Sequence, residues 1–309
     1  MDVWELSGVF GKALVYIGML AAIGGLLIIW LGRETAELVR LVVRRYMLPT
    51  ALLGLLASCF VFVVLVGSVN QNGISGMFDP VIGGILRDAQ PGTVLRWRLA
   101  GFVLTLLALV PLNLPVQLWQ EPRVRQFSIA VLLAAAVCFA VGVGSQGHAA
   151  PEGLLAQFMA SAHFIAIACW AGTFYPLYSL MLSRDIPAEA AARTAERFGQ
   201  VGWGILGLML VSGLTLIWQI TAGPLSLMQN THGKLLLVKL GLVALMMALG
   251  ALHKFIFVPG LRTAIRQGDE EHIQDSRRLL ARSIRSESLL ALLVLILTAT
   301  LTTVTGPGH

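Results

Sequence analysis

Eight long apolar segments constrain the fold of this chain more than any other feature. Each has about the ~20 residues that an α-helix needs to cross the ~30 Å hydrocarbon core of a bilayer. Of the 309 residues, 57% are hydrophobic and 12% are charged. Continuous apolar runs exclude the alternating strands of a barrel, so the sequence predicts an all-α membrane protein, a bundle of eight transmembrane helices. The predicted spans are 8–31, 48–69, 94–114, 127–144, 154–182, 199–220, 233–256 and 286–305.

The distribution of basic residues predicts the orientation of the bundle, because short loops rich in Lys and Arg stay in the cytoplasm. The opposite loops contain Arg87, with Arg96, Arg98 and Lys234 at the mouths of spans. Both termini are therefore expected on the exoplasmic (periplasmic) side. This topology also explains the net charge of +6, so the bilayer is the expected partner and no nucleic acid is expected. The arginines of the cytoplasmic loops are Arg33, Arg40, Arg44, Arg45, Arg123, Arg125, Arg184, Arg193, Arg197, Arg262, Arg266, Arg277, Arg278, Arg282 and Arg285.

The fifth span, "ASAHFIAIACW", contains an ionisable residue in an apolar helix, and such residues are functional candidates because they cost ~2.5–3.5 kcal/mol to insert. Met159 and His163 are four residues apart and share a helix face with Trp170 and Phe174. Thioether and imidazole groups are the ligands that Cu(I) prefers. Alternatively, His163 forms a hydrogen bond to a neighbouring helix and Met159 fills a gap. The spacing alone leaves both interpretations open.

Further histidines and methionines lie near the predicted outer surface. His163 is expected about 13 Å below the outer end of its helix, at about 1.5 Å per residue, within reach of the outer loops. Loop histidines can equally be solvated, without a role. The predicted metal ligands are His148, Met159, His163 and His232, with Met228 and His309 as weaker candidates.

The seventh span carries polar residues along one face for its whole length, and that face must contact protein or water. Chance alignment of sparse polar residues is the alternative. Glu287 is expected near the inner end of the eighth span, paired with Lys254, Arg282 or His253 in an exit site or a structural ion pair. The residues assigned to a polar pathway or to structural pairs are Lys12, Arg98, Lys239, Met246, His253 and Glu287.

Several segments resemble the CopD/PcoD family of bacterial inner-membrane copper-resistance proteins. The resemblance covers roughly residues 145–307 and rests on "GHAAPEGLLAQFMASAHFIAIACWAG", "RFGQVGWGILGLMLVSG", "THGKLLLVKLGLVALMMALGALHK" and "LARSIRSESLLALLVLILTATLTTVTGP". In the first half, "GTVLRWRLAG" is similar to the basic opening of the family's third span. We therefore expect a four-helix half at 1–144 and a CopD-like four-helix half at 145–309.

The resemblance implies a copper-handling protein of the bacterial inner membrane that moves copper toward the cytoplasm beside a periplasmic CopC-like partner. His148 and His163, with Trp170 and Gly172, occupy the positions of the family's "GHA…H…W-G" pattern. It implies no family role for His253, where a different polar residue would be expected.

Two further observations bear on the class of function. The sequence has no Walker A motif and no soluble domain with a phosphorylatable aspartate, so we expect no enzyme activity. The alternative is a haem-binding, cytochrome-like redox protein, which requires two histidines at equal depth on facing helices. A purely structural subunit would leave the polar face of the seventh span unexplained.

Overall fold

The computed structural model describes residues 2–112, 121–146, 153–220 and 231–301, without the side chains of Ile220, Thr231 and His232. These residues contain helices and turns and no strand. The eight predicted spans are confirmed as eight helical segments long and apolar enough to cross a membrane. They are Val3–Leu31, Ala36–Asn70, Gln90–Leu112, Pro122–Gly144, Leu154–Leu182, Ala188–Gln219, Gly233–Gln267 and Glu270–Leu301.

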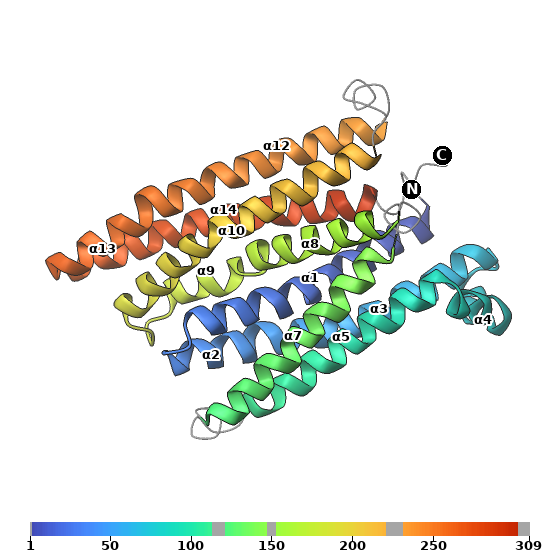
Figure 1. Cartoon of the computed structure of the whole chain (residues 1–309), viewed down its shortest axis with the longest axis horizontal. Helices are drawn as coiled ribbons and strands as arrows, with labels where there is room; N and C mark the ends of the chain where they lie inside the picture. The colour runs from blue at the N-terminus through green and yellow to red at the C-terminus, as the bar shows by residue number, and fades with distance from the viewer. Residues whose placement is uncertain (1, 113–120, 147–152, 221–230, 302–309) are drawn as a thin grey trace.

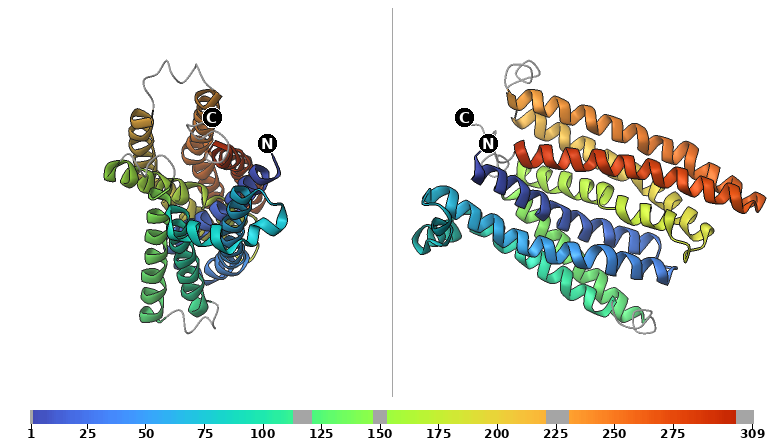
Figure 2. Two further views of the ribbon diagram at one scale, coloured as in Figure 1. Left: turned by 90° about the vertical axis from the view of Figure 1, so that its right-hand side faces the viewer. Right: turned by 180° about the vertical axis from the view of Figure 1, so that it is seen from behind.

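The spans form two groups that meet along α1 and α8 (Figures 1 and 2). The N-terminal group contains α1 (Val3–Leu31), α3 (Leu48–Asn70), α5 (Gln90–Leu112) and α7 (Pro122–Gly144). The C-terminal group contains α8 (Leu154–Ala171), α9 (Phe174–Leu182), α10 (Ala188–Ile220), α12 (Thr231–Leu252) and α14 (Glu270–Leu301). Because α1 packs against both α3 and α8, it joins the two groups into one bundle.

The loop arginines gather at one end of the bundle, which we call the arginine-rich end. The first turn of α1 and the last turn of α14 lie at the other end, which is also the end of the short helix α4 (Pro80–Asp88) (Figure 1). We call this the α4 end. The gathering of the loop arginines at one end of the bundle matches the alternation of basic and less basic loops along the sequence. Which end faces the cytoplasm remains a prediction.

The helices extend beyond the apolar runs at the arginine-rich end, so the predicted span boundaries there were too short. The structure adds α2 (Ala36–Val42) and α13 (Val258–Gln267) and lengthens the starts of α10 and α14. Ion pairs hold these extensions together: Glu34 pairs with Arg193 at 3.2 Å and Arg197 at 2.9 Å. The hydrogen bond and charge of Arg197, with a smaller effect of Arg193, lower the pKa of Glu34. A search for apolar runs cannot detect helix that continues through charged residues.

Three prolines explain three departures from regular helix within the spans. A proline has no N–H to donate to the carbonyl four residues before it. Pro49 follows a π-helical turn, η1 (Val43–Met47), and Pro259 follows another, η4 (His253–Phe257). Pro176 frees the carbonyl of Gly172, where the helix breaks between α8 and α9, and the Tyr46 hydroxyl donates to that carbonyl at 2.9 Å.

Candidate functional site

The first site residue, His163, lies on α8 and faces α10. Its Nδ1 atom lies 3.1 Å from the carbonyl oxygen of Met209 and 3.1 Å from the Ser212 hydroxyl. Gly213 leaves room for the ring, because a β-carbon built there would lie 3.0 Å from His163 Cε1. The sequence could suggest a hydrogen bond to a neighbouring helix, but it could not identify α10 as that helix.

The contact with Met209 fixes a proton on His163, since a carbonyl oxygen accepts hydrogen bonds and never donates one. Nδ1 therefore carries hydrogen, and in a neutral imidazole Nε2 keeps its lone pair. A metal-binding histidine is commonly held in this way, with its second nitrogen donating to a carbonyl. The hydrogen bond is thus equally compatible with a structural histidine and with a metal ligand that binds through Nε2.

Lys239 on α12 lies close enough to His163 for its charge to act on the imidazole. A positive neighbour repels a bound cation in proportion to the charge of that cation. The arrangement therefore favours a singly charged ion over a doubly charged one at His163. This preference agrees with the soft ligands around the site, because thioether and imidazole groups suit Cu(I).

The remaining predicted ligands are only partly visible. Met159 lies one turn before His163 on α8 and is half-buried. Within the described part of the chain, no three His, Cys, Asp or Glu side chains are grouped closely enough to hold a metal ion. A complete outer site therefore remains a prediction. The candidates His148, Met228 and His309 lie outside the described residues, and His232 is placed in α12 without its side chain.

Two predicted basic residues lie close together between α1 and α5. The charge of Arg98 acts on Lys12, and Arg98 is 6% exposed. Arg98 Nη2 donates to Gln146 Oε1 at 2.7 Å, while its Nε atom has no hydrogen-bond partner among the described residues. These two positive charges oppose passage of a bare cation between α1 and α5.

A second polar cluster lies toward the arginine-rich end, where η4 meets α14. Glu287 is 1% exposed, and its Oε2 atom lies 3.2 Å from Nδ1 of His253. The other ring nitrogen of His253, Nε2, lies 2.7 Å from the Ser283 hydroxyl. Of the three partners considered for Glu287 from the sequence, the structure selects His253. Lys254 instead donates to the carbonyl of Gly199 at 2.8 Å.

The two polar clusters are separate sites along α10. His163 contacts Met209, and Lys254 contacts Gly199, ten residues earlier on the same helix. At about 1.5 Å per residue, the contacts are roughly 15 Å apart along the helix axis. Met246, on α12 between them, is 4% exposed and belongs to the apolar core. One ion cannot contact both clusters at once.

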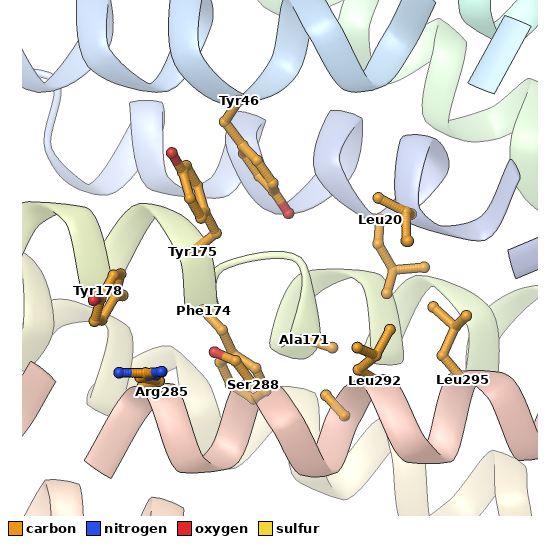
Figure 3. A pocket seen from close by; sticks show the side chains of 12 residues that line it. Leu20, Tyr46, Ala171, Phe174, Tyr175, Tyr178, Arg285, Ser288, Leu292 and Leu295 are labelled. Carbon is orange, nitrogen blue, oxygen red and sulfur yellow. The ribbon is translucent and has the colours of Figure 1, made fainter. Parts of the chain in front are cut away.

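A cavity of about 150 Å³ adjoins the second cluster and is lined by Trp170, Met247, His253, Lys254 and Glu287 among others. A larger cavity of about 310 Å³ lies between α1, α9 and α14 (Figure 3). Arg285 and Tyr178 lie at one end of it, and Leu20 and Leu295 at the other. No histidine, cysteine or methionine lines the larger cavity, so the described residues offer it no soft metal ligand.

Sequence reasoning missed the residues that complete both clusters: Met209, Ser212 and Gly213 around His163, and Ser283 beside His253. Ser212 lies in the segment "LMLVSGLTL", where a serine beside a glycine is typical of ordinary helix packing and indicates no functional site. Ser283 lies four residues before Glu287, hence on the same face of α14. That spacing is the one signal that could have identified it.

Comparison with known proteins identifies the family. The profile "Copper resistance protein D-like, N-terminal domain" matches residues 4–158, and "Copper resistance protein D" matches residues 192–301. The chain is 27% identical over 248 residues to the "Copper transport protein CutJ" of Bacillus subtilis (strain 168). The alignment covers 76% of this chain and 41% of that protein, so the chain spans less than half of its relative. No solved structure matches.

The family resemblance expected from the sequence is thereby confirmed, while the division of the chain at residue 144 stays a prediction. The N-terminal profile covers half of the chain, and the second profile covers the helices that carry His253 and Glu287. With its eight candidate spans, this chain is a multi-pass membrane protein that belongs to the copper resistance protein D family.

Proposed function

We propose that this protein moves copper, as Cu(I), across the bacterial inner membrane toward the cytoplasm and catalyses no covalent reaction. The observation that supports the proposal most directly is the pairing of His163 with Met159, an imidazole and a thioether one helical turn apart within a span, with Nδ1–H of His163 held by the Met209 carbonyl. This arrangement leaves Nε2 free to bind a metal ion. The relative CutJ is named a copper transport protein, which supports the same cargo.

The outer site would be completed by ligands that the structure does not describe. From α8, His163 supplies an imidazole about 13 Å from the start of the helix, and Met159 supplies a thioether about 7.5 Å from it. We propose that His148 or His232 adds a further nitrogen ligand, with Met228 and His309 as additional donors. A periplasmic CopC-like protein is the proposed source of copper, because the outer site would lie at the periplasmic surface.

The haem-binding alternative requires a second histidine that faces His163 at the same depth. The described residues place none there: Nδ1 of His163 contacts a backbone carbonyl and a serine, and His253 contacts Glu287 and Ser283. We therefore expect the purified protein to show no haem absorption bands. A haem spectrum that is lost in His163→Ala would favour the redox function instead.

The transport function is tested in sealed proteoliposomes that contain a Cu(I)-chelating dye. We expect Cu(I) to enter vesicles with the purified protein faster than it enters protein-free vesicles. His163→Gln is expected to slow entry, because glutamine can donate to the Met209 carbonyl but supplies no imidazole. Gly207→Ala serves as a control, since its β-carbon would meet no atom within 4 Å. Equal entry with and without the protein would contradict the proposal.

A further inference from the structure

Glu287 is a buried carboxylate within a span, and only one of its two oxygens takes part in an ion pair. An unpaired or poorly solvated charge in a membrane span costs several kcal/mol. Glu287 Oε2 is paired with His253, whereas Oε1 makes no hydrogen bond of regular geometry with any described residue, and the Trp170 side chain is the polar group that acts on the carboxylate from α8. The atoms nearest to a β-carbon built on Gly250 are Glu287 Oε1 at 3.7 Å and Trp170 Cζ2 at 4.0 Å. The ion pair with His253 accounts for one of the two carboxylate oxygens, so the environment of Oε1 needs another explanation.

The His253–Ser283 contact allows the pair to gain and lose a proton without moving. When His253 is neutral and Nδ1–H donates to Glu287, Nε2 accepts a hydrogen bond from the Ser283 hydroxyl. When His253 is an imidazolium, Nε2–H donates to the same hydroxyl oxygen. A hydroxyl can serve in both directions because its hydrogen rotates. The geometry therefore suits both protonation states.

The cavity beside the His253–Glu287 pair has room for water that can exchange a proton with the pair. Its volume of about 150 Å³ leaves room for several water molecules, each of which occupies about 30 Å³ in the liquid. Glu287 and His253 both line it. Water in this space can hydrogen-bond to Oε1 of Glu287 and carry a proton to or from the pair.

The charges around the cavity make proton binding and copper passage compete. Its walls come from α8, α9, α10, α12, η4, α13 and α14, and the titratable or charged side chains among the described residues that line it are His253, Lys254 and Glu287. Lys254 lies 4.7 Å from the centre of the Trp203 ring. Without the extra proton, His253 is neutral and Glu287 is ionised, so the negative charge of the pair offsets the positive charge of Lys254. With the proton, the pair is neutral and the cavity is left positive, which repels a copper cation.

We propose that His253 and Glu287 form a proton-binding site whose loading alternates with the passage of copper, so that the protein exchanges copper for protons. The proton passes between this pair and cavity water, and no bond to copper forms at the pair. The inference rests on the proposed transport function, because exchange requires copper to move.

The coupling is tested with Cu(I) and an imposed pH gradient in proteoliposomes at zero membrane potential. One-for-one exchange predicts that the steady-state ratio of copper across the membrane changes about tenfold per pH unit, since each tenfold ratio corresponds to about 1.4 kcal/mol. Glu287→Gln and His253→Gln should remove this dependence. Glu37→Gln, which changes an exposed carboxylate on α2, should retain it. Copper uptake by the parent protein that ignores the pH gradient would overturn the coupling and leave the transport function standing.

A second measurement addresses the proton site directly and does not depend on transport. Infrared difference spectra of the purified protein, recorded between high and low pH, should contain a ring band of an imidazolium that is lost in His253→Gln, because the loaded pair is an imidazolium beside a carboxylate. Glu287→Gln should weaken this band, since the imidazolium loses its carboxylate partner, and Glu37→Gln should keep it. If Glu287→Gln fails to fold, judged by gel filtration and melting, the comparison of the parent with His253→Gln decides. Parent and His253→Gln spectra that are identical in this region would overturn the proton site even if copper is transported.

Discussion

Arg277 shows at the residue scale how this protein accommodates a buried charge without a carboxylate. The side chain is 4% exposed and donates to the carbonyls of Leu180, Met181, Ser183 and Ile186. These carbonyls lie at and just beyond the end of α9, where a helix lacks internal donors. A cation at a helix C-terminus is also favoured by the helix dipole. Arg277 therefore anchors α14 to the end of α9.

We expect Arg277→Met to destabilise the protein by about 2–3 kcal/mol, because buried carbonyls lose charged donors. Arg277→Lys should recover part of this loss, since an ammonium group keeps the charge but cannot reach the same set of acceptors. Arg278→Met, at an exposed neighbour paired with Asp275, is the matched control and should change stability little. Thermal melting in detergent measures the three variants. Equal melting of Arg277→Met and the parent would contradict this role.

The buried ionisable residues could be predicted from the sequence, but their hydrogen-bond partners could not. His163, His253 and Glu287 could be selected from the sequence because an ionisable side chain in an apolar run is costly. Their partners could not be selected, since a carbonyl such as that of Met209 has no sequence signature and serines are common in helices. The register between α8 and α10 decides which groups meet, and hydropathy does not determine register.

At the element scale, three prolines and one glycine contact shape the helices. The existence of the spans followed from hydropathy, whereas the break at Gly172 did not, because the residues around it are as apolar as the rest. Pro176 was the available signal, four residues after the freed carbonyl. At this break α1 approaches closely: a β-carbon on Gly24 would lie 2.1 Å from the carbonyl carbon of Gly172. The two helix backbones are therefore in direct contact.

We expect Gly24→Ala to destabilise the protein by about 1–3 kcal/mol or more, because the added methyl group forces α1 away from α8 and α9. The Tyr46–Gly172 hydrogen bond should weaken with it, since both depend on the same crossing. Gly207→Ala provides a control in an open position. A melting curve for Gly24→Ala that superimposes on that of Gly207→Ala would show that the crossing tolerates a β-carbon.

At the scale of the whole molecule, the charge asymmetry predicts the orientation, and labelling can test it. After replacement of Cys59, Cys138 and Cys169 by alanine, single cysteines are introduced at Ile74 near the α4 end and at Glu37 near the arginine-rich end. A membrane-impermeant maleimide should label Ile74→Cys in intact spheroplasts and Glu37→Cys only after lysis, because basic loops stay inside. The opposite pattern would reverse every assignment of an inner and an outer site.

Copper binding at His163 is tested most directly by an anaerobic Cu(I) titration of the purified protein. We predict that His163→Gln and Met159→Leu weaken binding at least about tenfold, or about 1.4 kcal/mol, because each removes a soft-metal ligand. Melting is measured in parallel, and Gly207→Ala should bind as the parent does. If His163→Gln melts at a lower temperature but binds Cu(I) with the affinity of the parent, His163 is a packing residue and the copper site lies elsewhere.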